Sequence, residues 1–249
     1  MSKKKFKQPK WKRNLENSSE KKYHLLSDDF LKEIPSNYLN SIPFLTMDRR
    51  NLTKALIRIE LFKKIIDIPG CIVECGSYRG NGIGLYSLLS SILEPYNYNR
   101  KIISFDTFSG FKSVTTKDPT KAKLGDLKDV NLRFLKSALE ISNLNRPIGH
   151  LEKVELVIGD ACVEIPKYVK KNKALLVSLL YLDFDIYKPT AIALKYLFDL
   201  IPKGGVVAFD EFAQKKWEGE TVAAKKYIDF DRYEIKKFYY DPHIAYIVK

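Results

Sequence analysis

Cysteine is scarce in this chain, whose 249 residues include three, at positions 71, 75 and 162. A sparse, odd set excludes a disulfide framework and indicates a reducing compartment. Long apolar runs are missing too, since no segment approaches the ~20 apolar residues that cross a bilayer. The N-terminus also has no apolar signal-peptide core. We therefore expect a soluble, cytoplasmic protein with no membrane partner.

Histidine is equally scarce, and its three residues are scattered at His24, His150 and His243. A histidine-based catalytic or metal cluster is therefore not expected. The G-x-G-x-x-G fingerprint of dinucleotide-binding sites is absent as well. An NAD-dependent sugar-modifying enzyme on a similar sheet consequently stays open only as an alternative.

Acidic residues are absent from the first 13 residues, MSKKKFKQPKWKR, which carry seven of the net thirteen positive charges. A basic segment without apolar periodicity predicts a disordered tail over residues 1–22. Contact of this tail with an anion or a nucleic acid is the alternative, which keeps a nucleic-acid-binding protein open. The remaining charge of +6 is spread over 236 residues, so the body of the chain gives no reason to expect a nucleic acid partner.

What the chain does contain is an alternation of strand and helix patterns. Apolar runs predict strands over 71–76, 101–108, 153–161, 175–185 and 204–211. Amphipathic segments predict helices over 47–66, 81–93, 129–142, 189–201 and 220–230. The last two apolar runs, 233–241 and 243–249, have no helix between them and predict an antiparallel hairpin. The fold class is therefore α/β, with helices on both faces of a mostly parallel seven-stranded sheet, in the Rossmann-like class I methyltransferase arrangement.

The expected organisation is a single domain over residues 23–249, with irregular structure over 23–46. The polar, Lys-rich segment 112–128 predicts a lid loop. In the helix predicted over 47–66, the apolar face is expected at Leu52, Leu56, Ile59, Phe62 and Ile66.

Acidic residues end every strand of the predicted parallel core. Because ligands bind at the carboxyl ends of strands in such sheets, these acids are expected to lie around one site. The alternative is that each acid caps the helix that follows it. The set consists of Glu74, Asp106, Asp160, Asp183, Asp185, Asp210 and Glu211.

The first three strand ends predict the ligand. Gly76 and Gly80 follow the first strand and allow close approach of the backbone, and Glu74 beside them suits a cationic group. Asp106 suits the two hydroxyl groups of a ribose, and Asp160 suits the amino group of an adenine. An adenosine with a positively charged tail is S-adenosylmethionine.

The last two strand ends predict a cation. Asp183, Asp210 and Glu211 converge if their strands are neighbours, and a set of oxygen ligands suits Mg²⁺ or another hard divalent cation. Asp185 lies on the same side of the strand as Asp183 and is a candidate general base for a hydroxyl group. The alternative for Asp185 is a cap of the helix that starts near Pro189.

Four segments carry a resemblance to a known family: IPGCIVECGSYRGNG, IISFDTFSGF, LLYLDFDIYKPTAIALKYLFDLIPKGGVVAFDEF and GET. In order and spacing, over about residues 45–230, they resemble the macrocin O-methyltransferase (TylF/MycF) family of class I S-adenosylmethionine-dependent methyltransferases. The resemblance implies Mg²⁺-assisted methylation of a hydroxyl group on a sugar or glycoside, with nucleotide-linked sugars included. A homo-oligomer would be unsurprising, since a lid can be formed partly by a neighbouring subunit. An RNA methyltransferase, suggested by the basic tail, is the alternative to a sugar-modifying one.

Carried over by position, the resemblance implies metal ligands at Asp183, Asp210 and Glu211, and catalytic roles for Asp185 and Asp183. The chain departs from the family pattern at Glu211, where a second Asp is usual, and at Pro189, where Ser is usual. The implied cofactor residues are Glu74, Gly76, Ser77, Gly80, Asp106, Thr107, Phe108, Asp160, Ala161 and Asp183.

Overall fold

The computed structural model describes residues 18–38 and 42–249, and the chain divides into two compact units at Leu52/Thr53. The first unit contains α1 (Ser18–Glu33), the 3-10 helix η2 (Ser36–Tyr38) and α2 (Pro43–Thr46). The prediction of irregular structure over 23–46 is therefore wrong for α1. Its 16 residues contain neither Gly nor Pro, the two residues that most disfavour a helix, so the segment can form one. Of the predicted basic tail, residues 1–17 lie outside the described residues, and residues 18–22 belong to α1.

The second unit is built on a seven-stranded sheet with the order β3-β2-β1-β4-β5-β7-β6. Strands β1 to β5 pair in parallel, and β7 runs antiparallel to β5 and β6. This confirms the predicted fold class and the terminal hairpin. The strands are β1 (Cys71–Cys75), β2 (Ile102–Asp106), β3 (Val154–Ile158), β4 (Val177–Leu182), β5 (Val206–Phe209), β6 (Lys236–Lys237) and β7 (Ala245–Val248).

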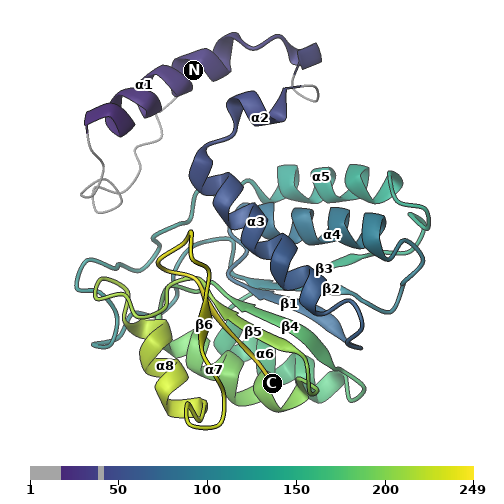
Figure 1. Cartoon of the computed structure of the whole chain (residues 1–249), viewed down its shortest axis with the longest axis vertical. Coiled ribbons are helices and arrows are strands. Elements are labelled where there is room, and N and C mark those ends of the chain that lie inside the picture. The colour runs from purple at the N-terminus through teal and green to yellow at the C-terminus, as the bar shows by residue number, and fades with distance from the viewer. Residues whose placement is uncertain (1–17, 39–41) are drawn as a thin grey trace. The chain divides into compact units, whose positions relative to one another are not determined.

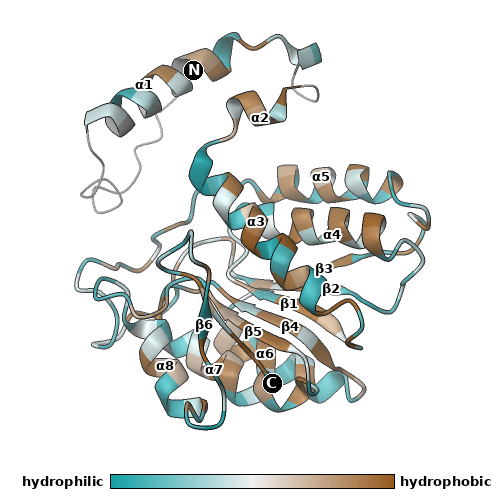
Figure 2. Ribbon diagram, viewed as in Figure 1, coloured by the Kyte–Doolittle hydropathy of each residue, from teal (hydrophilic) through white to brown (hydrophobic). Residues whose placement is uncertain are grey.

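Along each strand, successive side chains point to opposite faces of the sheet. Because both faces carry apolar side chains, helices cover both. On one face Ile72, Ile102 and Tyr181 pack with α3, α4 and α5, and on the other Val73, Phe105 and Leu180 pack with α6, α7 and α8 (Figure 1). Hydrophobic residues dominate the central strands accordingly (Figure 2). The helices are α3 (Arg49–Lys64), α4 (Asn81–Leu93), α5 (Leu132–Leu144), α6 (Ala161–Lys171), α7 (Tyr187–Leu197) with η3 (Phe198–Leu200), and α8 (Gly219–Tyr227).

Besides α1 and α2, which overlap the segment predicted to be irregular, two helices differ from the sequence prediction. Helix α6 was not predicted, because Pro166 lies inside it and a proline there removes a backbone hydrogen bond. Helix α3 was predicted, but its buried residues are Ile57, Arg58, Leu61 and Phe62, whereas the expected Leu56 is 45% exposed. The inward side of α3 includes an arginine, which an apolar pattern does not reveal.

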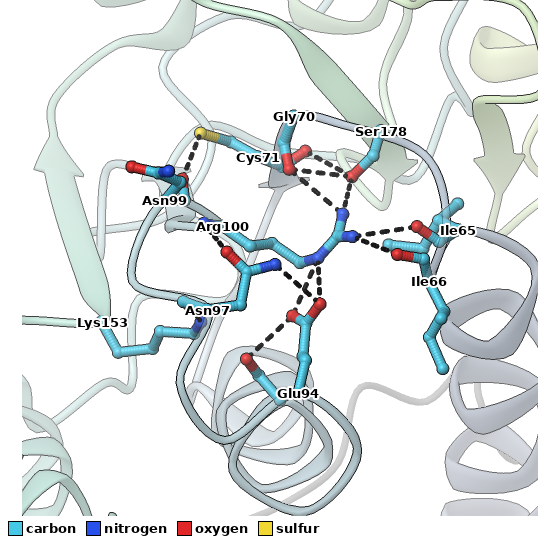
Figure 3. Close-up of polar contacts among 11 residues, drawn as sticks. Ile65, Ile66, Gly70, Cys71, Glu94, Asn97, Asn99, Arg100, Lys153 and Ser178 are labelled. Atoms are coloured by element: carbon cyan, nitrogen blue, oxygen red, sulfur yellow. Dashed lines mark hydrogen bonds and ion pairs between the residues drawn. The ribbon is translucent and has the colours of Figure 1, made fainter. Parts of the chain in front are cut away.

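At the amino-terminal ends of the strands, Arg100 connects several elements (Figure 3). Its guanidinium donates to the carbonyls of Ile65 and Ile66 after α3, to the Gly70 carbonyl before β1 and to Ser178 Oγ in β4. Glu94 accepts from its Nε at 2.8 Å. Arg100 is 3% exposed, so these bonds stabilise the edge of the sheet opposite to the strand ends that carry the acids.

Within the described ranges, no helix combines the length and the hydrophobicity that a membrane-spanning segment needs.

Candidate functional site

The carboxyl ends of β1 and β4 border a cavity at the point where the strand order reverses, which is where open α/β sheets bind ligands. The space between its walls is about 590 Å³, and part of it is open to solvent. The predicted residues that line it are Gly76, Asp106, Thr107, Asp160, Ala161, Asp183 and Asp185. Lining residues that were not predicted as site residues include Tyr78, Gly110, Phe111, Lys112, Ser113 and Leu127.

Asp106 ends β2 inside this cavity, and the loops after β1 and β2 both hold its carboxylate. The backbone N–H groups of Tyr78 and Phe108 each donate to it at 2.7 Å. Burial raises the pKa of Asp106, while these N–H groups act in the opposite direction. Asp106 also lines the cavity, where a carboxylate can accept from the hydroxyl groups of a ribose.

Asp160 combines the two roles that were set against each other in the sequence. Its Oδ1 accepts from the backbone N–H of Cys162 at 2.9 Å, which caps α6. The same residue, with Ala161, lines the cavity. Capping of α6 fixes the side chain of Asp160 at the edge of the cavity.

The glycines after β1 are required first by packing within the protein. A Cβ on Gly76, whose φ is +91°, would lie 1.9 Å from the Asp183 carbonyl oxygen. A Cβ on Gly80, whose φ is +84°, would lie 2.3 Å from a Leu135 methyl group. Gly76 lines the cavity and Gly80 is the residue before α4, so only Gly76 also stands beside the ligand space.

Four predicted cofactor residues lie outside the cavity. Glu74 is 1% exposed, its Oε1 accepts from Arg58 Nη2 at 3.0 Å, and Gly82 lies directly over its carboxylate. The cationic partner of Glu74 in this structure is therefore an internal arginine. Ser77 shares a hydrogen bond with Ser104, and Phe108 is packed in the core beside Leu135; Gly80 is the fourth.

Asp183 and Asp210 follow the neighbouring strands β4 and β5, as predicted, and two cations from α3 lie against them. Lys54 Nζ is 2.6 Å from Asp210 Oδ2, and Arg58 Nη2 is 3.7 Å from Asp183 Oδ2. Tyr181 donates its hydroxyl to Asp210 at 2.7 Å, and the Arg58 guanidinium lies 4.1 Å from the centre of the Tyr181 ring. The strand-end acids are therefore paired with α3.

The pKa values of the two carboxyl groups are shifted in opposite directions. Burial raises the pKa of Asp183 well above its usual range, and repulsion from Asp210 adds to this. Burial also acts to raise the pKa of Asp210, but Lys54 and Arg58 outweigh it and lower the pKa. Asp210 is thus the member of the pair that holds its negative charge.

The predicted metal ligands fit a cation in part. The Lys54 ammonium lies against Asp210, so this carboxylate binds a positive charge. The predicted ligand atoms are carboxylate oxygens, the hard donors that Mg²⁺ prefers. Among the residues that the structure describes, no three His, Cys, Asp or Glu side chains are grouped as a metal site. In this structure Lys54 lies against Asp210 and Arg58 lies near Asp183, so the assignment of Asp183, Asp210 and Glu211 as metal ligands stays a prediction.

Asp185 lines the cavity with a left-handed backbone, at φ +61°. Its backbone N–H donates to Glu220 Oε1 at 3.3 Å, and the N–H of Glu211 donates to Glu220 Oε2 at 3.1 Å. At the start of α7, the N–H of Tyr187 donates to Asp118 at 2.6 Å, so Asp118 caps this N–H group of the helix.

Asp118 belongs to the segment 112–128, which forms turns and no helix or strand. Its Oδ2 also accepts from the N–H and hydroxyl of Thr115, and Lys117 lies 4.0 Å from the Tyr187 ring. Lys112 and Ser113 line the cavity. The segment therefore forms one wall of the cavity and is attached to the start of α7.

Lys54, Arg58 and Glu220 contact predicted site residues through their side chains and were not assigned from the sequence. A signal for two of them existed, because Lys54 and Arg58 are four residues apart on a predicted helix and therefore share a face. Acids gathered at one edge need such partners. Glu220 had no comparable signal beyond its place in the GET segment.

Comparison with known proteins adds independent observations. A family model described as macrocin-O-methyltransferase (TylF) matches residues 47–232. The crystal structure of CalS11, described as a calicheamicin methyltransferase, superposes with a TM-score of 0.90 at 29% identity and 99% coverage of both chains. The apo structure of CalS11, described as a TDP-rhamnose 3'-O-methyltransferase, gives a TM-score of 0.81 at 29% identity, covering 94% of this chain and 95% of that one.

The O-methyltransferase NovP is more distant, with a TM-score of 0.56, 20% identity and 79% coverage of each chain, and this likeness concerns the fold alone. No curated protein sequence matches significantly.

Proposed function

Since the chain belongs to the macrocin O-methyltransferase family, we propose that it methylates a hydroxyl group of a sugar or glycoside. It is an O-methyltransferase, and S-adenosylmethionine is its methyl donor. The observation that carries the proposal is the cavity in which the acids that follow β2 and β3 lie with two acids that follow β4. CalS11 is described as acting on TDP-rhamnose, so nucleotide-linked sugars are the first acceptor class to test.

The residues take the following roles in the proposal. Asp106 binds the ribose hydroxyl groups, and Asp160 binds the adenine amino group. Gly76 brings the backbone close to the cofactor. The bound cofactor supplies an electrophilic methyl group on its sulfonium. Asp185 accepts the proton that the acceptor hydroxyl loses, as a positioned general base.

Mg²⁺ assistance is part of the proposal. Asp183 and Asp210 would hold the cation, and Glu211 is the third ligand implied by the family. Lys54, which is 2.6 Å from Asp210, would have to give up this contact to the cation. The cation would make the acceptor hydroxyl more acidic. The cytoplasmic location and a homo-oligomer remain predictions from the sequence.

The test is a methyl transfer assay with S-adenosylmethionine and a panel of nucleotide-linked sugars and glycosides, read by mass spectrometry of the acceptor. Asp185→Asn should lower kcat about 10²–10⁴-fold, the range for loss of a general base, without changing the Kd of S-adenosylmethionine. Asn tolerates the left-handed conformation of residue 185, so the fold should persist.

A chelator followed by Mg²⁺ addition tests the cation in the same assay. Activity that EDTA abolishes and Mg²⁺ restores supports it, and full activity in EDTA contradicts it. A folded protein that binds S-adenosylmethionine but methylates no sugar in the panel contradicts the proposed acceptor class.

A further inference from the structure

Glu220 is a buried acid that joins two loops of the candidate site. It is 0% exposed and is the second residue of α8. Its two oxygens accept from different loops: Oε1 from the N–H of Asp185 after β4, and Oε2 from the N–H of Glu211 after β5. A single side chain therefore links the candidate base to a predicted ligand of the cation.

The backbone of Asp185 needs such a partner. The left-handed region is strained for a non-glycine residue, and Asp is one of the few that visits it. At φ +61°, the N–H of Asp185 points to Glu220 Oε1. The bond to Glu220 therefore holds residue 185 in a conformation that its sequence neighbours do not impose.

The start of α8 is packed closely enough to make this link specific. A Cβ on Gly219 would lie 2.6 Å from the backbone nitrogen of Tyr187 and 2.9 Å from Asp118 Oδ1. The absence of a side chain at 219 thus lets α8 begin directly against the turn between β4 and α7. Glu220 reaches Asp185 because of that contact.

The chemistry of Glu220 indicates more than support of the fold. Both oxygens of its carboxyl group are used, one by the N–H of Asp185 and the other by the N–H of Glu211. Only a carboxylate offers two equivalent acceptor oxygens to N–H groups that come from two loops.

We propose that Glu220 is a positioning residue, which sets Asp185 relative to Glu211 for methyl transfer. The inference rests on the proposed function, in which Asp185 accepts the proton of the acceptor. It concerns geometry, because Glu220 is buried behind the loops and the atoms it contacts are backbone nitrogens.

The first experiment compares Glu220→Gln with the wild-type protein in the methyl transfer assay. The amide keeps the shape but turns one acceptor oxygen into a donor that faces a backbone N–H. We expect kcat to fall roughly 100-fold, as a small misplacement of a reacting group can cause, with an unchanged Kd for S-adenosylmethionine. A merely structural role would instead change kcat, this Kd and the thermal midpoint together.

Thr221→Val is the matched control. Thr221 is the next residue of α8, and its hydroxyl accepts from the N–H of Ala213 at 2.8 Å, farther along the loop after β5. The variant removes one bond from the same helix turn but leaves both bonds of Glu220. It should keep the kcat of the wild type, and a loss equal to that of Glu220→Gln would overturn the inference.

A double variant tests whether Glu220 acts through Asp185. If it does, Glu220→Gln should have little further effect on kcat in the Asp185→Asn background, because residues that act as a unit are not additive. Losses that multiply in the double variant would show that Glu220 acts elsewhere, and would sink the proposal.

Amide hydrogen exchange, measured by mass spectrometry with S-adenosylmethionine bound, gives a readout that does not depend on the acceptor. In Glu220→Gln, the segments that contain the N–H groups of residues 185 and 211 should exchange faster, while β2 stays unchanged. Unchanged exchange at both segments overturns the inference even if sugars are methylated. Faster exchange in a protein that methylates no sugar contradicts the proposed function alone.

Discussion

Arg58 contacts groups from three parts of the sheet edge, and its removal has a defined consequence. Its guanidinium is 3.0 Å from Glu74, 3.7 Å from Asp183 and 4.1 Å from the centre of the Tyr181 ring. Arg58→Met leaves Glu74 buried without its cation, which should lower the free energy of unfolding by about 3–5 kcal/mol. Urea unfolding measures this.

The companion variant for Arg58 is Arg58→Met combined with Glu74→Gln. Because the buried carboxylate is then gone, we expect part of the lost stability to return. A double variant as unstable as the single one would show that Glu74 is not what makes the loss of Arg58 costly.

Lys153 gives a prediction about pH. It is 2% exposed, its Nζ donates to the Asn97 carbonyl at 2.8 Å, and burial lowers its pKa from 10.5 to about 8. The folded state binds fewer protons than the unfolded state between these values, so stability rises with pH in that window. Below pH 8 the cost of burying the charge is fully present, and above 10.5 it is gone.

Measured against Lys153→Met, the wild-type protein should therefore gain roughly 3 kcal/mol between pH 8 and 10.5. The comparison of two variants cancels the titration of all other groups. A difference in unfolding free energy that stays constant across this range would show that Lys153 keeps its ordinary pKa.

Among the strands and helices, the contact of β1 with β4 sets the most stringent requirement. Gly76 ends this contact at φ +91°, and a Cβ there would lie 1.9 Å from the Asp183 carbonyl oxygen. Gly76→Ala should cost about 1–3 kcal/mol from backbone strain alone, and it should abolish S-adenosylmethionine binding because the residue after β4 must shift. Urea unfolding and calorimetric titration measure the two effects.

Gly84→Ala is the control within α4. A Cβ at Gly84 meets nothing within 4 Å, so this change should stabilise the protein by about 0.5–1 kcal/mol through helix propensity. Equal changes in unfolding free energy for Gly76→Ala and Gly84→Ala would refute the argument from the close contact of Gly76 with Asp183.

For helix α3, the sequence predicted the helix but not the side that is buried. Its existence followed from periodicity, yet its buried side contains Arg58 instead of the expected Leu56. Hydrophobic patterns assume that apolar residues face the core. A helix that packs on a row of acids turns its cations inward instead.

For the whole molecule, the uneven charge leads to a further prediction. Residues 1–13 carry seven of the thirteen net positive charges, so their deletion leaves +6. Deletion should leave kcat for the sugar acceptor unchanged and should remove any salt-sensitive retention on RNA. Retention that survives deletion would revive the RNA methyltransferase alternative.

The amino-acid pattern was sufficient for the sheet, for most of its helices and for the acids at its carboxyl edge. Periodicity and strand-end composition are local properties, so β1 to β5 and α4 appear at their predicted places. The acids predicted around one cavity, from Asp106 to Asp185, lie there because parallel strands end at the same edge.

The partners of those acids were decided by tertiary structure. Lys54 and Asp210 are 156 positions apart, and Asp185 and Glu220 are 35 apart. No local pattern connects such residues, because their contact exists only after α3 and α8 pack against the finished sheet. Hence Glu74 pairs with Arg58 in the core, and a buried glutamate, not its own neighbours, holds the backbone of Asp185.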